Sequence, residues 1–265
     1  MPASPILAPT RGRQILAWLV HAYTAMGLVC AAGMAVAIFE GTPASFRLAF
    51  VLMVVACAID ATDGTFARLV RVKQVLPSFD GARLDDITDF LTYTFLPLLL
   101  IWRADLVPAD HAWLLLVPLI ASAYGFCQTM AKTPDGHFLG FPSYWNVVAF
   151  YLYVLRPPFW LTETILIVLA VLTFVPLRYL YPSQKGLLNR VMLVLVAVWG
   201  LLLCWMLSIL PSDRVPSMIE DTRLQTVTWI SLIVPACYMA VSWAESWRVM
   251  RRKAGGQADW DGHWD

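Results

Sequence analysis

Four aspartates are the residues of this sequence whose type and spacing are best suited to chemistry. Asp60 and Asp63 stand three residues apart in one apolar segment, and Asp85 and Asp89 stand four apart at the start of the next. Side chains at these spacings share one face of a helix, with their roots about 5–6 Å apart. Charged groups inside a bilayer are costly and usually mark a functional site. The pattern therefore predicts a site built from two pairs of carboxylates.

The two pairs are expected to meet, because consecutive membrane helices run antiparallel and the pairs lie near the facing ends of their helices. Carboxylates gathered in one small volume repel one another, and divalent cations relieve that repulsion. Their oxygens suit Mn²⁺ or Mg²⁺, and two such ions can hold a diphosphate during transfer. We therefore expect a site for two ions, with these ligands: Asp60, Asp63, Asp85 and Asp89.

The residues around the aspartates also fit phosphoryl chemistry. Gly64 lets a ligand approach the helix backbone. Ala67, nearly one turn further on, has a small side chain that leaves space on the same helix face. Arg68 can donate paired hydrogen bonds to phosphate oxygens or orient a carboxylate. Gly81 precedes the third apolar segment and would permit close contact between helices.

Other residues of reactive type fall outside this pattern. Asp80 and Asp86 do not share the spacing of the four acids, so we expect them at a helix cap or in a loop. His21 has no metal-ligand partner nearby in the sequence and is expected to be packed or to cap a helix. The cysteines lie inside apolar runs without metal-ligand spacing and are expected to be buried apolar side chains: Cys30, Cys57, Cys127, Cys204 and Cys237.

Composition places the aspartates in a membrane protein. Hydrophobic residues make up 59% of the chain and charged residues 14%, whereas a soluble domain is nearer half apolar and a quarter charged. The apolar residues form runs near the roughly 20 residues that a helix needs to cross a bilayer. We predict an all-α, polytopic membrane helix bundle with eight spans, at 14–38, 45–70, 85–103, 111–131, 144–156, 162–180, 190–210 and 225–247. The fifth of these is short for a complete crossing.

Arginine and lysine predict the orientation of the bundle. With eight spans and the N-terminus in the cytoplasm, cytoplasmic segments hold fourteen of these residues and the opposite side holds five. Cytoplasmic loops carry such an excess, so both termini and the aspartates are expected on the cytoplasmic side. We expect a single transmembrane domain over residues 1–253 and a polar tail over 254–265. The net charge of +1 gives no indication of nucleic-acid binding.

The aspartates and their neighbours together resemble the signature of the CDP-alcohol phosphotransferase family, DxxDGxxAR followed by GxxxDxxxD. All fixed positions of that signature are present: Asp60, Asp63, Gly64, Ala67, Arg68, Gly81, Asp85 and Asp89. Twelve residues separate Arg68 from Gly81, more than in most members. This longer gap, the eight-span layout and the segment GFPSYWNVVAFYLY at 140–153 resemble the bacterial phosphatidylcholine synthases within the family.

The resemblance implies an enzyme of the bacterial inner membrane that transfers the phosphatidyl group of CDP-diacylglycerol to choline, giving phosphatidylcholine and CMP. It implies that Asp60, Asp63 and Asp85 bind metal and that Asp89 is a ligand or the catalytic base. The CDP pocket would comprise Asp63, Gly64, Ala67, Arg68 and Gly81. The implied partners are these substrates and products, membrane lipid and, in a homodimer, a second copy of the chain.

Choline carries a permanent cation, which proteins usually hold against aromatic rings. Tyr93 lies one helical turn after Asp89 on the same face, close to where the choline hydroxyl must react. Tyr144 and Trp145 open the fifth span on the same side of the membrane. We expect at least one of these three rings to contact the acceptor.

Three alternatives remain open on the sequence. The same kind of enzyme could use serine, inositol phosphate or glycerol phosphate, and basic residues for a phosphorylated acceptor are available at Lys132, Arg178, Lys185 and Arg190. An ion-coupled transporter would explain the acids but not the glycine, alanine and arginine at fixed offsets. A catalytically silent membrane protein would not need the complete set of aspartates.

Overall fold

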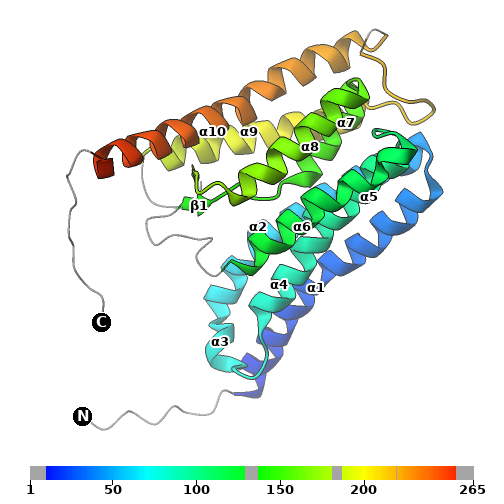
Figure 1. Ribbon diagram of the computed structural model, residues 1–265. Helices are drawn as coiled ribbons and strands as arrows, with labels where there is room; N and C mark the ends of the chain where they lie inside the picture. The colour runs from blue at the N-terminus through cyan, green and yellow to red at the C-terminus, as the bar shows by residue number, and fades with distance from the viewer. Residues whose placement is uncertain (1–9, 129–136, 181–186, 219, 255–265) are drawn as a thin grey trace. The chain divides into compact units, whose positions relative to one another are not determined.

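The protein is described by a computed structural model that covers residues 10–128, 137–180, 187–218 and 220–254 (Figure 1). These residues form a series of helices and one pair of short strands. The elements in chain order are α1 Arg11–Glu40, α2 Pro43–Val70, α3 Val72–Val75, α4 Gly81–Asp89, the π-helix η1 Phe90–Phe95, α5 Leu96–Arg103, the 3₁₀-helix η2 Ala109–Leu115, α6 Leu116–Cys127, β1 His137–Leu139, α7 Trp145–Leu155, α8 Phe159–Phe174, β2 Arg178–Leu180, α9 Leu187–Ile209 and α10 Thr222–Ala254.

The helices have the lengths and surfaces of a membrane protein, which confirms the predicted fold class. Among the described residues, five stretches are long and apolar enough to cross a bilayer: Arg11–Glu40, Pro43–Val70, Ala109–Cys127, Val191–Ile209 and Thr222–Arg248. Large apolar side chains such as Phe39 and Leu201 are exposed on helix surfaces, where lipid would cover them. The 11 residues of α7 reach only about 16 Å. This is about half the thickness of a bilayer core of about 30 Å, and a complete crossing by the fifth predicted span stays a prediction.

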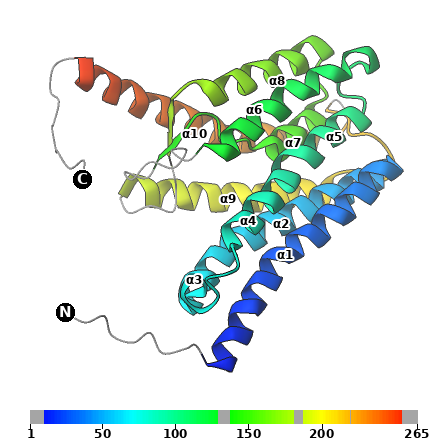
Figure 2. The same cartoon turned by 60° about the horizontal axis from the view of Figure 1, so that its bottom comes forward.

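The chain forms two compact units. The first unit comprises Met1–Ala109, Tyr144–Arg156 and Pro211–Val215, and it contains every residue of the aspartate signature. Within it α1 packs along α2 and also contacts α3, α4 and α5, while α7 packs against α5 and α2 (Figure 1, Figure 2). The expectation of a single domain over residues 1–253 stays a prediction, and residues 255–265 of the expected tail lie outside the described residues.

A tight connection sets the antiparallel pairing of α1 and α2. Gly41 ends α1 in the left-handed conformation, with φ of 71°, and its N–H donates to the Ala37 carbonyl, as is common after a helix C-terminus. Thr42 and Ser45 then form a reciprocal capping box, and Pro43 stands in the first turn of α2. Because only Gly41 and Thr42 separate the helices, α2 must return along α1.

Small residues allow α4 to lie close against α1. A Cβ atom added at Gly27 of α1 would collide with Cγ2 of Thr88 in α4. A Cβ atom at Gly81, the first residue of α4, would lie 2.5 Å from Cε1 of His21 in α1. The expected role of Gly81 in helix contact is thus confirmed, and His21 is the packed histidine that the sequence predicts. The close approach holds α4, which carries Asp85 and Asp89, beside the α1–α2 hairpin.

The third predicted span is one helical stretch that changes its winding after the second acid pair. It runs as α4 to Asp89, as the wider π-helix η1 from Phe90 to Phe95, and as α5 from Leu96. Pro97 explains the change, because it lacks the N–H that would bond the Tyr93 carbonyl and its ring would clash with that carbonyl. At the junction the Leu96 N–H instead bonds the Leu91 carbonyl, five residues back. Such π segments are frequent at functional sites.

The second unit departs from the predicted spans in two places. In it α6 packs against α8, and α9 packs against α10. The predicted helix 162–180 is too long: α8 ends at Phe174, because Pro176 pushes Val175 into an extended conformation. Arg178–Leu180 then pairs as strand β2 with β1, which the sequence analysis did not predict. The predicted span 111–131 begins as 3₁₀-helix, and α6 ends at Cys127.

Candidate active site

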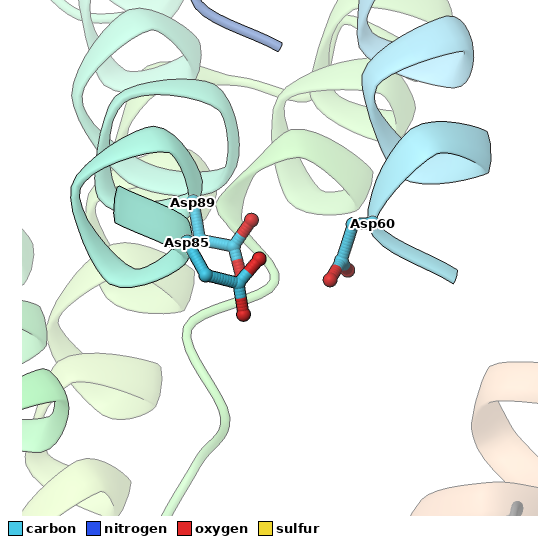
Figure 3. Close-up of side chains that lie close together, drawn as sticks. All are labelled: Asp60, Asp85 and Asp89. Atoms are coloured by element: carbon cyan, nitrogen blue, oxygen red, sulfur yellow. The ribbon is translucent and has the colours of Figure 1, made fainter. Parts of the chain in front are cut away.

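Three aspartates from two helices meet in the first unit. Asp60 of α2, Asp85 of α4 and Asp89 at the end of α4 each place one carboxylate oxygen within 4.8 Å of the others. Figure 3 shows Asp85 and Asp89 projecting from one helix face toward Asp60 on the other helix. All three side chains are half-buried. The prediction that the acid pairs of two consecutive helices converge is therefore met by these three residues.

Asp63, the fourth acid, is not part of this group. Its side chain is buried, with 5% of the residue exposed. Its Oδ2 atom accepts a hydrogen bond of 2.7 Å from the hydroxyl of Thr24 on α1. The structure thus holds Asp63 against α1, and its role as a metal ligand stays a prediction.

Tyr93 lies at the aspartate cluster, as the sequence predicts. It contacts the cluster through its hydroxyl group. The hydroxyl donates a hydrogen bond of 2.7 Å to Oδ2 of Asp60. The ring is half-buried. Its centroid lies 6.4 Å from that of Tyr144, the residue before α7. Two of the three predicted acceptor residues, Tyr93 and Tyr144, therefore lie together, and Tyr93 contacts one of the acids.

The third predicted acceptor residue, Trp145, is fully buried. Tyr144 has 36% of its surface exposed, so its ring is more accessible than that of Trp145. Contact of any of these rings with an acceptor stays a prediction. Of the basic residues considered for a phosphorylated acceptor, Lys132 and Lys185 lie outside the described residues. Arg178 falls in β2 and Arg190 in α9.

The remaining signature residues occupy the end of α2 and the start of α4. Arg68 is exposed and donates a hydrogen bond of 3.0 Å to the Thr65 hydroxyl. A Cβ atom at Gly64 would lie 3.4 Å from Nη1 of Arg68, so the glycine leaves room beside the guanidinium. Ala67 is partly buried and packs against a small apolar cluster of Ala17, Val20, Val72 and Val75. Their part in a CDP pocket, like that of Gly81, stays a prediction.

The two other acids near α4 behave differently from each other. Asp80 is the N-cap of α4, and its carboxylate accepts the Arg83 backbone N–H, as expected of a capping residue. The expectation of a cap or loop is wrong for Asp86, which is exposed within α4. The reason is that the Asp80 cap starts the helix at Gly81, four residues before the predicted span, so Asp86 falls within the helix.

Cys57 and Asn146 extend the site in a way that the sequence analysis missed. The Asn146 side-chain amide of α7 donates to Sγ of Cys57 on α2, at 3.2 Å. Cys57 stands three residues before Asp60, so it lies on the same face of α2. It is therefore not simply an apolar side chain. The expectation of burial holds for Cys30 and is wrong for Cys127, Cys204 and Cys237, which are exposed because their helices present apolar surface outward.

Comparison with known proteins shows the family. The phosphatidylcholine synthase of Legionella pneumophila is 39% identical over 202 residues, covering 73% of this chain and 76% of that protein. The chain belongs to the bacterial phosphatidylcholine synthase family. The phosphatidylcholine synthases of Pseudomonas aeruginosa and Bradyrhizobium diazoefficiens are 37% and 38% identical, over 75% and 74% of this chain and 82% and 73% of theirs. No protein-family model matches the sequence.

The acid cluster of this phosphatidylcholine synthase family member fits a hard divalent cation. Its donors are carboxylate oxygens, which Mg²⁺ and Mn²⁺ prefer over softer ligands. Asp60, Asp85 and Asp89 approach closely enough for one ion to contact all three. Without a cation these half-buried groups would repel one another. In the described part of the chain, one group of three or more aspartate, glutamate, histidine or cysteine side chains is suited to a metal ion, and it is this cluster.

Proposed function

We propose that this chain transfers the phosphatidyl group of CDP-diacylglycerol to choline, forming phosphatidylcholine and releasing CMP. The membership of the phosphatidylcholine synthase family supports the substrates and the product. The single structural observation that carries the chemistry is the meeting of Asp60, Asp85 and Asp89 across two helices. A carboxylate cluster in an otherwise apolar helix bundle suits the transfer of a charged phosphoryl group at a membrane.

The proposed reaction is one substitution at phosphorus. The choline oxygen forms a bond to the phosphorus that carries diacylglycerol, and the bond from this phosphorus to the bridging oxygen breaks. CMP leaves with that oxygen. Asp89 accepts the proton of the choline hydroxyl, because it lies in one cluster with Asp60, to which Tyr93 donates a hydrogen bond, and the acceptor is expected at Tyr93. The remaining acids hold the reacting groups in a fixed arrangement.

Asp60, Asp85 and Asp89 would hold Mn²⁺ or Mg²⁺, with Asp63 as the further ligand that the signature predicts. Bound divalent ions supply neutralisation of the charge on the diphosphate as it is transferred. Arg68 is placed to contact phosphate oxygens beside Gly64, since it is exposed at the end of α2. We also propose that the site faces the cytoplasm of a bacterial inner membrane, from the distribution of arginine and lysine.

An acceptor panel tests this function. Purified protein is incubated with CDP-diacylglycerol, Mn²⁺ and one acceptor at a time: choline, serine, inositol phosphate or glycerol phosphate. We expect CMP release and a new phospholipid with choline, in equal amounts. Turnover with another acceptor and none with choline would overturn the choice of acceptor. No CMP with any acceptor would overturn the transferase function itself.

A further inference from the structure

Two polar side chains from other elements form hydrogen bonds to the face of α2 that carries Asp60. Asn146 of α7 donates to Sγ of Cys57 on α2, at 3.2 Å. Tyr93 donates to Oδ2 of Asp60, at 2.7 Å. Side chains from two other elements thus bond to Cys57 and Asp60, which share one face of α2, and Tyr93 is the one that reaches the acid cluster. The signature does not include Asn146, Cys57 or Tyr93.

The winding of the third helical stretch decides where Tyr93 stands. Tyr93 lies inside the π-helix η1, between Asp89 and Pro97. In an unbroken α-helix its carbonyl would bond the backbone N–H of residue 97, which a proline lacks. The wider turn accommodates the proline and shifts the residues of η1 relative to the acids of α4. The Tyr93 hydroxyl thereby reaches α2 and bonds Asp60 across the gap between the helices.

We propose that Tyr93 is a positioning residue that orients the Asp60 carboxylate toward Asp85 and Asp89 for metal binding. This inference rests on the proposed function in one respect, because both require the acid cluster to take part in the reaction. A hydrogen bond to an ionised carboxylate is short and strong. It therefore fixes the direction in which the other Asp60 oxygen points. Groups that hold a metal ligand in place typically change metal affinity by about 10–100-fold when they are lost.

Tyr93→Phe tests the proposal because it removes the hydroxyl and keeps the ring. The protein is purified without metal in detergent, and binding of Mn²⁺ is measured by electron paramagnetic resonance of the free ion. We expect the Mn²⁺ dissociation constant to rise about 10-fold or more in Tyr93→Phe, with the choline KM unchanged because the aromatic face remains.

Tyr23→Phe is the matched control. Tyr23 lies on α1, and its hydroxyl and that of Thr62 on α2 share a hydrogen bond of 2.9 Å, between the two acid-bearing positions of α2. The substitution also removes one hydroxyl that bridges to α2, but that hydroxyl bonds to Thr62 and not to a carboxylate. Its Mn²⁺ affinity should equal that of the wild type.

A rescue separates positioning from a general loss of packing. Incorporation of 4-aminophenylalanine at position 93 restores a ring donor and should restore Mn²⁺ affinity, even if Tyr93→Phe fails to fold. Wild-type affinity in a folded Tyr93→Phe variant would overturn the proposal. So would weak binding in a folded 4-aminophenylalanine variant, or no Mn²⁺ binding by the wild type. Mn²⁺ binding that depends on Tyr93, with no phosphatidylcholine formed, would leave the inference standing and overturn the proposed function.

Discussion

The hydroxyl of Thr24 on α1 donates a hydrogen bond of 2.7 Å to Oδ2 of Asp63 on α2. Both residues are buried, with 7% and 5% of their surfaces exposed. The second acid of the signature is thus held by the first helix, whereas Tyr93 of the third helical stretch holds the first acid, Asp60. The two acids of α2 are therefore oriented by hydroxyl groups from two different neighbouring helices.

Thr24→Val should weaken both folding and turnover. The substitution keeps the shape of the side chain and leaves a buried carboxylate without this donor, which costs about 1–3 kcal/mol of stability. Thr24→Ser keeps the hydroxyl and should remain close to the wild type. Thermal melting and CMP release of the two variants check this expectation. A Thr24→Val protein that melts and turns over like the wild type would show that the contact has no role.

Gly81→Ala should separate α4 from α1. The new Cβ atom would lie 2.5 Å from Cε1 of the packed His21 ring, so one of the two helices must shift. Overpacking of this kind costs about 1–3 kcal/mol, and the shift would also move Asp85 and Asp89. Gly12→Ala in α1 is the control, since nothing lies within 4 Å of its added Cβ. The double variant Gly81→Ala, His21→Ala should recover the lost melting temperature, and its failure to do so would argue against this contact.

Tyr144→Leu should raise the choline KM. Its ring lies beside Tyr93 and is partly exposed, so it can face the choline cation. Loss of one cation–π contact of about 1.4 kcal/mol corresponds to about a 10-fold change. The KM for CDP-diacylglycerol should hardly change, and Tyr144→Phe, which keeps a ring, should behave like the wild type. If Leu at Tyr93, Tyr144 and Trp145 each leaves the choline KM unaltered, choline binds elsewhere.

Labelling of cysteines tests the predicted orientation. In a chain whose exposed Cys127, Cys204 and Cys237 are replaced by serine, single cysteines are placed at positions 3, 212 and 260. The arginine and lysine bias predicts labelling of positions 3 and 260 only from the cytoplasm. Position 212, where Ser212 is exposed, should be labelled only from the opposite side. Labelling of the two ends from opposite faces would mean an odd number of crossings.

The sequence predicts the acid cluster because its signals are local. The spacing within each pair places two carboxylates on one helix face, and the short connection at Gly41 and Thr42 forces neighbouring helices to be antiparallel. Hydropathy likewise predicts the long helices. The end of α8 at Phe174 could have been read from Pro176, which is a local signal that the apolar run obscured.

The partners of the acids could not be predicted, because they depend on contacts between helices. Thr24 precedes Asp63 by 39 residues, and no spacing rule links them. Helical periodicity predicts that Tyr93 lies near Asp89, but its bond to Asp60 depends on the π-helix that Pro97 imposes. Pro97 indicates that the helix is distorted near this point. It does not indicate which side chains the distortion brings toward α2.

The central claim, that Asp60, Asp85 and Asp89 form the centre of a choline-dependent phosphatidyl transferase, is tested most directly at Asp85. Labelled choline and CDP-diacylglycerol are supplied to purified protein over a series of Mn²⁺ concentrations, and labelled phosphatidylcholine is measured. Asp86→Ala is the matched control, because Asp86 is the adjacent acid of α4 and is exposed outside the cluster. We predict metal-dependent synthesis by the wild type and by Asp86→Ala, and a loss of several orders of magnitude in a folded Asp85→Ala protein. Full activity in Asp85→Ala, or synthesis that persists in EDTA, would contradict the account.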